Sequence, residues 1–570
     1  MNKALKIVLI VVGVFVVLLL VAPFLIPVNQ FRPTIEEKAS AALGRKVQLG
    51  DLSLSLIGGS LSAENLSIGD DPKFSSAPFL TAKSLKVGVE ILPLILSKTL
   101  NVTGVTIDSP QVTLIRGSAG QWNYSSLGGA ATKSPAGQTA AAQPTGSTSA
   151  PADLTIKKLE LKDGSIIVGA ANSQKRSTYD HVDVTASNVA ITSQFPVVVT
   201  ADLPAGGKFK LDGVVGPIDQ ADAALTPVTA KLDVSSLNLA STGFLDPSLG
   251  LGGIVDLDST LESKGGEAEV KGNVKLSKAL LIAGGSPAGV PVIVDFHTKY
   301  DLRKNAGVLD PSTLKIGSAA AHLSGTYETA GEATSVNIKV EGKDMPAKDF
   351  ESFLPALGIN MPKGASLTAG VINTDLNVTG PTNKLVTNGS VGLFNAKLSG
   401  FDLGSKMSGI ASLAGIKSGK DLDIEKLSSN LHMAPDGLKA DNFVAAIPSV
   451  GNLTGAGTID SKNALDFKMA ATLTSTLGDV GSPVSSTAGL LGKAMGSRGG
   501  GCKTGTTVPF QIQGTTSEPK FIPDVGGLAA GMLKSQFGCA GGLAAGGAKD
   551  AEKGPEDAVK SLGGLFKKKP

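Results

Sequence analysis

Residues 51–70 read DLSLSLIGGSLSAENLSIGD, and this stretch decides the fold. Leu52, Leu54 and Leu56 alternate with polar residues, and the alternation resumes after a glycine-rich break. Because the side chains of a strand point alternately to its two faces, each half predicts a strand with one apolar and one polar face. The pattern fills most of the chain, so something must cover a large apolar surface.

The same period of two recurs along the chain and predicts a mainly β protein. Short turns rich in Gly, Asn, Asp and Pro separate the segments. Parallel strands need crossover connections of about a dozen residues or more. These are mostly missing, so we expect a mainly antiparallel sheet. The clearest segments are Leu85–Ile91, the residues around Pro110, Leu154–Gly164, Val182–Thr192 and Lys208–Val215.

Helical segments are few and short. Arg32–Leu43 predicts a helix, because Pro33 suits a helix start, Glu36 suits its first turn and Gly44 is a natural C-cap. Its residues Ile35, Ala39, Ala42 and Leu43 fall near one stripe, so we expect an amphipathic helix that leads into a strand at Val47. Two further candidates are Ala347–Leu357 and Lys406–Leu413.

Bulk composition limits the function classes. The chain has 570 residues and a net charge of +3, so a general affinity for nucleic acid is not indicated. Aromatic residues make up 4%, which is low for a surface that stacks bases. We therefore expect no nucleic-acid partner.

The N-terminus predicts a membrane anchor. Lys3 and Lys6 precede the charge-free run Ile7–Val28, which at about 1.5 Å per residue reaches roughly 33 Å, enough for a bilayer core of about 30 Å. The alternative is a cleaved signal peptide, but the run is longer than the usual hydrophobic region and no convincing cleavage site follows it. The basic side stays in the cytoplasm, so the rest of the chain is expected outside it.

Catalytic and metal-binding patterns are not found in the sequence. The four histidines, at positions 181, 297, 322 and 432, form no pair with the spacing of metal ligands. No G-x-S-x-G motif is present, and Gly496–Thr504 lacks the adjacent Gly-Lys of a phosphate loop. We expect no catalytic residues, metal or cofactor, and a protein that is not an enzyme.

Two residue types support smaller predictions. Cys502 and Cys539 are the only cysteines, and in an oxidising compartment such a pair is expected to form a disulfide, with two free thiols as the alternative. Trp122, the only tryptophan, is expected to pack in a turn, with a lipid-interface anchor as the alternative.

Several stretches resemble the AsmA family. They are a single anchor followed by Phe31–Gly59, the leucine-rich turn Leu92–Leu96, the strand Ile107–Arg116, the step Gly120–Asn123, and the closing strands Gly451–Met469 and Val508–Val525. The resemblance implies a long curved sheet with a hydrophobic interior, anchored in the bacterial inner membrane and projecting into the periplasm. It implies a bridge-like lipid carrier, linked to outer-membrane lipid balance and protein assembly, and no catalytic residues.

The fold prediction is therefore a long, curved, antiparallel sheet forming a hydrophobic groove, with one N-terminal transmembrane helix and a few short helices. Five parts are expected: the cytoplasmic tip and anchor (1–28), a chorein-like β unit (29–127), a flexible Ala/Gly/Pro/Ser/Thr linker (128–153), the main β-groove (154–477) and a Gly/Ala-rich C-terminal region with closing strands and a basic end (478–570).

An apolar sheet face is covered by helices, by a second sheet, by closure or by a ligand. Helices are scarce here, and about twenty strands at roughly 4.8 Å spacing would extend near 100 Å and curl into a trough. Acyl chains would fill it at about 0.8 kcal/mol per buried CH₂. The alternative is an array of ordinary β-sandwiches. The groove candidates are Leu52, Leu54, Leu56, Leu85, Val87 and Val89.

Two function classes remain open at this point. The first is an envelope protein that binds and conducts phospholipid acyl chains between the inner and outer membrane, with a possible outer-membrane or envelope protein partner. The second is a β-rich scaffold, without lipid, that assists the assembly of outer-membrane proteins.

Overall fold

The computed structural model describes residues 28–55, 59–90, 93, 102–117, 121–127, 155–171, 173–219, 222, 225–245, 250–330, 333–406, 419–473 and 507–524. Several predictions fall wholly or largely outside these residues. Among them are the membrane span Ile7–Val28 apart from its last residue, the turn Leu92–Leu96 apart from Pro93, the linker 128–153, the helix Lys406–Leu413 apart from Lys406, the groove candidate Leu56, and the pair Cys502 and Cys539. In the described part of the chain, no helix has both the length and the apolar character needed to cross a membrane.

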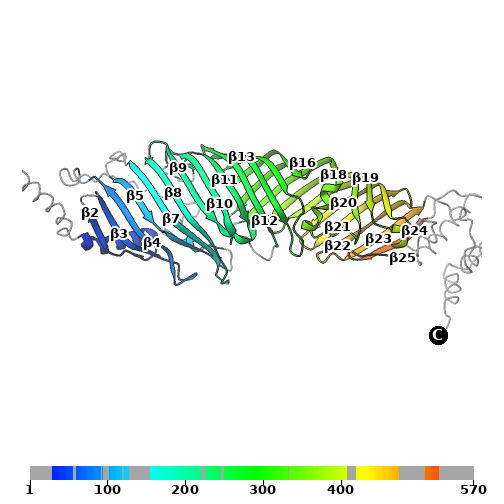
Figure 1. The fold of residues 1–570 in the computed structure, drawn as a ribbon, viewed down its shortest axis with the longest axis horizontal. Coiled ribbons are helices and arrows are strands. Elements are labelled where there is room, and N and C mark those ends of the chain that lie inside the picture. The colour runs from blue at the N-terminus through cyan, green and yellow to red at the C-terminus, as the bar shows by residue number, and fades with distance from the viewer. Residues whose placement is uncertain are drawn as a thin grey trace, which may run out of the picture.

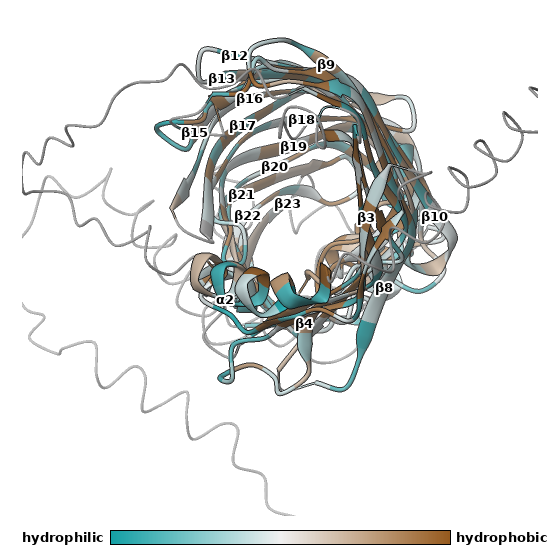
Figure 2. Ribbon diagram, turned by 90° about the vertical axis from the view of Figure 1, so that its left-hand side faces the viewer, coloured by the Kyte–Doolittle hydropathy of each residue, from teal (hydrophilic) through white to brown (hydrophobic). Residues whose placement is uncertain are grey.

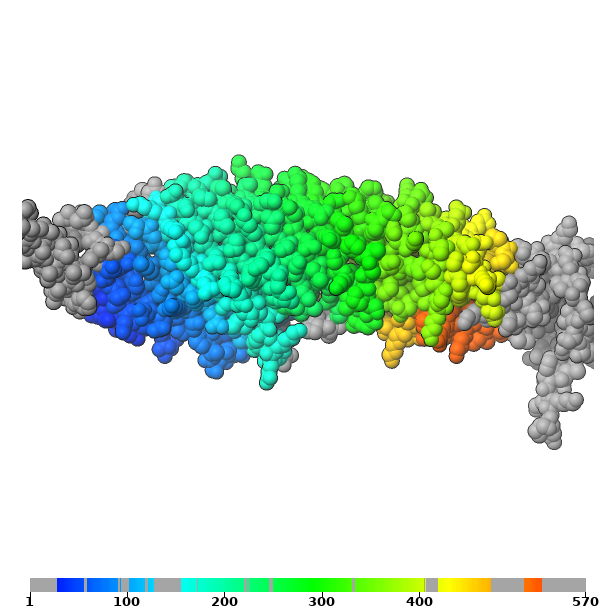
Figure 3. Space-filling model, viewed as in Figure 1, coloured from blue at the N-terminus to red at the C-terminus, as the bar shows by residue number. Residues whose placement is uncertain are grey.

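The described residues form one sheet of 25 strands, which runs the length of the molecule (Figure 1). The chain is mainly β, as the alternation predicts. From β7 onward, strands that follow one another in sequence are neighbours in the sheet, and Figure 3 accordingly shows the colours changing steadily from one end to the other. The strands are β1 (Val47–Gln48), β2 (Leu52–Ser55), β3 (Ser60–Gly69), β4 (Pro78–Val89), β5 (Val102–Asp108), β6 (Gln111–Arg116), β7 (Ile156–Ala170), β8 (Arg176–Val189), β9 (Phe195–Leu203), β10 (Gly207–Val215), β11 (Val228–Asn238), β12 (Gly252–Lys264), β13 (Glu267–Leu280), β14 (Val292–Asp301), β15 (Ala306–Ile316), β16 (Ala319–Ala330), β17 (Ala333–Pro346), β18 (Ser366–Pro381), β19 (Val386–Ser399), β20 (Asp421–Ala434), β21 (Gly437–Ile447), β22 (Gly451–Asp460), β23 (Leu465–Leu473), β24 (Thr507–Gly514) and β25 (Pro519–Pro523).

The helices are short, as expected. They are the α-helices α2 (Arg32–Leu43), α4 (Ala347–Glu351) and α5 (Leu403–Lys406), and the 3₁₀ turns η1 (Val28–Phe31), η2 (Asn123–Ser126), η3 (Pro204–Gly206), η5 (Leu239–Ser241) and η7 (Leu354–Leu357). The helix predicted at Arg32–Leu43 is confirmed, with Gly44 as its left-handed C-cap. The helix predicted at Ala347–Leu357 is divided into α4 and η7. Of Lys406–Leu413, only Lys406 lies within the described residues, as the last residue of α5.

The sheet is mainly antiparallel, as expected, with an exception at β7. β5 and β6 lie end to end beside β7, and both pair with it in parallel, whereas the other strand pairings among the described residues are antiparallel. A parallel pairing requires a long connection. Residues 117–155, which include the predicted linker, supply that length, so the sheet is mixed at this point.

The sheet is not flat. Figure 2 shows its strands curling around the long axis of the molecule. The register shifts at several places, and the extra residue there has a left-handed backbone, with φ between 46° and 54°. Such bulges bend a strand and increase its twist, so they contribute to the curl. These residues are Asp163, His181, Ser236, Asp344 and Asn442.

Candidate functional site: the inner face of the sheet

One face of the sheet is lined by apolar side chains that follow each other from strand to strand through the register. We call this surface the inner face. Its first row includes two of the predicted groove residues, and its members are Leu52, Ala63, Leu85, Ile107, Leu161, Val184, Val199, Leu211 and Leu232. A parallel row contains Leu54, Leu61, Val87, Val105, Leu159, Ala186 and Val197.

The inner face continues without interruption to the last strand. One row crosses the middle of the sheet through Phe209, Val234, Leu257, Val274, Val294, Leu314 and Ala321. From β16 onward the next row runs through Leu323, Val340, Leu376, Gly389, Leu431, Ala440, Gly457, Phe467, Ile512 and Phe521. The alternation at residues 51–70 is thus one end of a surface that spans all the described strands.

The structure places the described groove candidates as follows. Leu52 and Leu85 flank Ala63 on the first row, while Leu54 and Val87 flank Leu61 on the second. Val89, at the end of β4, is buried. Whether lipid contacts these five side chains stays a prediction.

Two contacts identify this face as the concave one. The β11–β12 connection folds back over it and reaches β8, three strands away, where the Tyr179 hydroxyl donates a hydrogen bond of 2.8 Å to the Thr242 carbonyl oxygen. Phe350 and Phe353, from the α4–η7 segment, also pack on this face beside Leu314. A flat sheet would place β8 and the β11–β12 connection about 14 Å apart at about 4.8 Å per strand, so the sheet bends toward this side.

In the middle of the sheet the inner face is only half-covered. Leu211, Leu232, Val234 and Leu257 are all intermediate in exposure, although each lies in the centre of its strand. Apolar side chains in a closed protein core are normally fully buried. Within the part of the chain that the structure describes, no second sheet lies on these residues, so the sandwich alternative is not what the described residues form.

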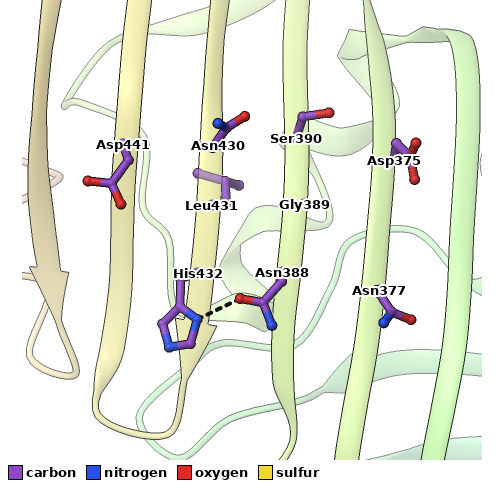
Figure 4. A pocket seen from close by; sticks show the side chains of 9 residues that line it. All are labelled: Asp375, Asn377, Asn388, Gly389, Ser390, Asn430, Leu431, His432 and Asp441. Carbon is purple, nitrogen blue, oxygen red and sulfur yellow. Dashed lines mark hydrogen bonds between the residues drawn. The ribbon is translucent and has the colours of Figure 1, made fainter.

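The outer face is polar and solvated. Lysine and aspartate side chains alternate with the apolar residues and form exposed ion pairs, such as Lys315 Nζ with Asp295 Oδ2 at 2.9 Å. The hydrogen bond from Lys315 lowers the pKa of Asp295. A shallow depression on this face is lined by polar side chains, among which His432 Nδ1 and Asn388 Oδ1 are 2.7 Å apart (Figure 4). Such a surface suits water and not acyl chains.

The C-terminal end of the inner face is closed and filled. The connection before β18 reaches the turn between β24 and β25, where the Lys363 N–H donates to the Ser517 carbonyl at 3.2 Å and the Lys363 ammonium pairs with Glu518. The eight strands from β18 to β25 thereby wrap into a barrel-like unit. Its centre is filled by a cluster that includes Leu453, Phe467 and Phe510, none more than 9% exposed. We call β18–β25 the closed end.

The N-terminal end is held by polar contacts to the first strands. Backbone N–H groups of Val47, Leu49 and Leu52 donate to the side chains of Ser40, Glu36 and Asn29, at 2.9, 2.7 and 2.7 Å. The hydrogen bond from the Leu49 N–H is the largest influence that lowers the pKa of Glu36. These contacts occupy donors of the edge strand that would otherwise be open to another strand.

A buried polar network supports the N-terminal strands, and our sequence reasoning missed most of it. Arg45 bonds to Asp70 at 3.2 Å, to the Asn123 carbonyl at 2.9 Å and to Ser126 at 2.6 Å. Asn123 is fully buried and donates through Nδ2 to Asp70 and to the Thr113 carbonyl, both at 2.8 Å. Only Asn123, in the Gly120–Asn123 motif, carried a sequence signal.

Trp122 is part of a small aromatic cluster at this end, in agreement with the packing interpretation. Its ring centroid lies 5.6 Å from that of Phe244 and 6.0 Å from that of Tyr124. The ring centroids of Phe244 and Tyr179 lie 6.1 Å apart. Burial raises the pKa of Tyr179 to about 12. The cluster fixes the β11–β12 connection over the inner face.

Comparison with known proteins gives one match. Residues 1–242 match the model described as the AsmA family. No curated protein and no solved structure matches the chain.

Proposed function

We propose that this chain, whose residues 1–242 match the model of the AsmA family, binds phospholipid acyl chains along the inner face and conducts them between the inner and outer membrane. In this proposal the chain is anchored in the bacterial inner membrane by Ile7–Val28, its bulk lies in the periplasm, and it supports outer-membrane homeostasis. It acts as a carrier and not as an enzyme.

The observation that carries the proposal is the continuous, half-covered apolar surface in the middle of the sheet. Water against such a surface is unfavourable, and an acyl chain laid on it would gain about 0.8 kcal/mol per buried CH₂. A similar gain is available to the same chain in a bilayer, so its transfer between the two is close to balanced. A surface of this kind favours movement along it, since every row offers nearly the same side chains.

The test compares two adjacent residues on opposite faces of β4. A photo-crosslinking amino acid replaces Val87, on the inner face, or Lys86, which is exposed on the outer face. After illumination in cells, mass spectrometry of the purified chain identifies attached lipid. We expect phospholipid adducts at position 87 and not at position 86.

The second function class predicts a different result. A lipid-free scaffold for outer-membrane protein assembly would give protein adducts, or none, at both positions. That outcome would overturn the proposal of lipid carriage and would favour the scaffold.

A further inference from the structure

In helix α2, Glu36, Ser40 and Leu43 are partly covered by the protein, whereas Ile35 and its neighbour Glu37 are exposed. Glu36 and Ser40 face the edge of the sheet, where they accept hydrogen bonds from Leu49 and Val47. No residue of the helix is buried. Hydrogen bonds to the open strand edge thus help to hold the helix in place.

The exposed side of α2 carries an apolar stripe. Phe31 and Ile35 are 53% and 39% exposed, and both are among the most exposed large apolar residues that the structure describes. One and two further turns along the helix, Lys38 and Ala42 extend the same stripe, because residues three or four apart share a helix face. Apolar residues followed by a lysine on one stripe fit the boundary between acyl chains and phosphates, where a lysine can extend its ammonium toward the phosphates.

The anchor that the sequence predicts would bring this stripe to a bilayer. The charge-free run Ile7–Val28 ends where η1 begins, three residues before Phe31. Val28 packs against Leu49, Leu52 and Ala63, the start of the inner face. If the run crosses a membrane, as the sequence predicts, Phe31 stands within about 6 Å of the last residue of the span at about 2 Å per 3₁₀ residue.

We propose that α2 lies on the surface of the bilayer that holds the anchor, with Phe31 and Ile35 inserted at the headgroup–acyl boundary. The partner of this surface is the phospholipid bilayer itself. The contact fixes the start of the inner face against the membrane. It goes beyond the proposed function, since α2 can dock on lipid whether or not the inner face carries it.

The experiment uses the full-length chain in phosphatidylcholine–phosphatidylglycerol vesicles that contain brominated phosphatidylcholine. Trp122→Phe removes the only native tryptophan while keeping an aromatic ring in its cluster. A single tryptophan is then introduced as Phe31→Trp or Ile35→Trp. The matched control is Val308→Trp on the outer face of β15, where Val308 is 47% exposed.

We expect brominated lipid to reduce the fluorescence of tryptophan at positions 31 and 35 and to leave position 308 unchanged. Emission at positions 31 and 35 should also shift to the blue relative to position 308. Absence of quenching at both positions would overturn the proposal. A blue shift without quenching would do so as well, because it would show that protein, from this chain or a second copy, covers α2.

This result is independent of lipid carriage. The lipid adduct at Val87 tests the proposed function, whereas quenching at position 35, within α2, tests the docking of α2. If no lipid adduct forms at Val87 but quenching is retained, the docking of α2 stands without the proposed function. If the adduct forms but quenching is absent, the proposed function stands without the docking of α2.

Discussion

The middle of the sheet and its closed end have the same alternation and reach different states. In the middle, Leu211, Leu232 and Val234 are half-exposed on the inner face, whereas Leu453 and Phe510 in the closed end are 8% and 2% exposed. Alternation decides which face a side chain takes. The size of the side chains and the wrapping of the strands decide whether that face is filled by the protein or left for another molecule.

The two regions differ in the side chains that line them. Leucine, valine, alanine and glycine predominate on the middle rows, while phenylalanines from β21, β23, β24 and β25 meet inside the closed end. The rings of Phe443 and Phe467 meet edge to face at 6.5 Å, and those of Phe510 and Phe521 lie 6.3 Å apart. Bulky rings fill a narrow barrel, so no room of the size of an acyl chain is expected there.

The largest expected contrast is in lipid contact. A photo-crosslinking residue at Leu232 should give lipid adducts, because that side chain is half-exposed on the inner face, whereas the same residue at Leu453 should give none. Mass spectrometry of the crosslinked chain measures both. Equal lipid adducts at the two positions would show that the closed end opens in the cell and would remove the distinction between the regions.

The positions of the strands in both regions could be predicted from the sequence. Which region is filled by its own side chains could not. Period-two alternation predicted the strands around Pro110 and at Lys208–Val215, and Pro33 and Gly44 predicted the ends of α2. These signals are local, because they depend on side-chain direction and on capping within a few residues.

Closure was not predictable in the same way. It depends on Lys363 meeting Ser517 and Glu518, and Lys363 lies 155 residues from Glu518 in the chain. No local pattern encodes how far 25 strands curl before two connections meet. The buried Arg45–Asp70 pair also depends on a long-range contact, because its two residues come from separate turns. Long-range contacts therefore decide where the sheet closes, which the alternation does not specify.

The next contrast is in stability. Phe510→Ala should lower the free energy of unfolding of the closed end by about 3–5 kcal/mol, because it removes a buried ring and leaves a cavity. Leu232→Ala should cost about 1 kcal/mol or less, since the half-exposed side chain has less apolar surface to lose from contact with protein. Urea unfolding, followed region by region with hydrogen exchange and mass spectrometry, measures both. A Leu232→Ala effect as large as that of Phe510→Ala would mean that the middle is packed like a core.

A fall in pH should reduce hydrogen-exchange protection more at the N-terminal end than at the closed end. The hydrogen bond from the Leu49 N–H lowers the folded-state pKa of Glu36. The contribution of Glu36 to stability is therefore present above the ordinary glutamate pKa of about 4.3 and is lost as pH falls through the lower folded value. We expect hydrogen-exchange protection of β1 and β2, corrected for intrinsic rates, to fall in acid. Glu36→Gln should show reduced protection already at pH 7 and a weaker dependence on pH.

The closed end supplies the control for that experiment. Its contacts are mainly apolar, so protection of β24 should change less over the same range of pH. If β24 lost protection as early as β1, acid would be acting on the whole sheet and not on the Glu36 contact.

The smallest expected effect concerns the ion pair at the seam of the closed end. Lys363 and Glu518 are exposed, with 77% and 61% of their side-chain surface accessible, and exposed pairs contribute about 0.2–1 kcal/mol. Lys363→Glu should speed hydrogen exchange in β25 slightly, and the double exchange Lys363→Glu with Glu518→Lys should restore it. The double variant is the matched control, because it keeps both charges and reverses only their positions. A loss of closure in Lys363→Glu as large as that caused by Phe510→Ala would show that the seam, and not the phenylalanine packing, keeps the closed end different from the middle.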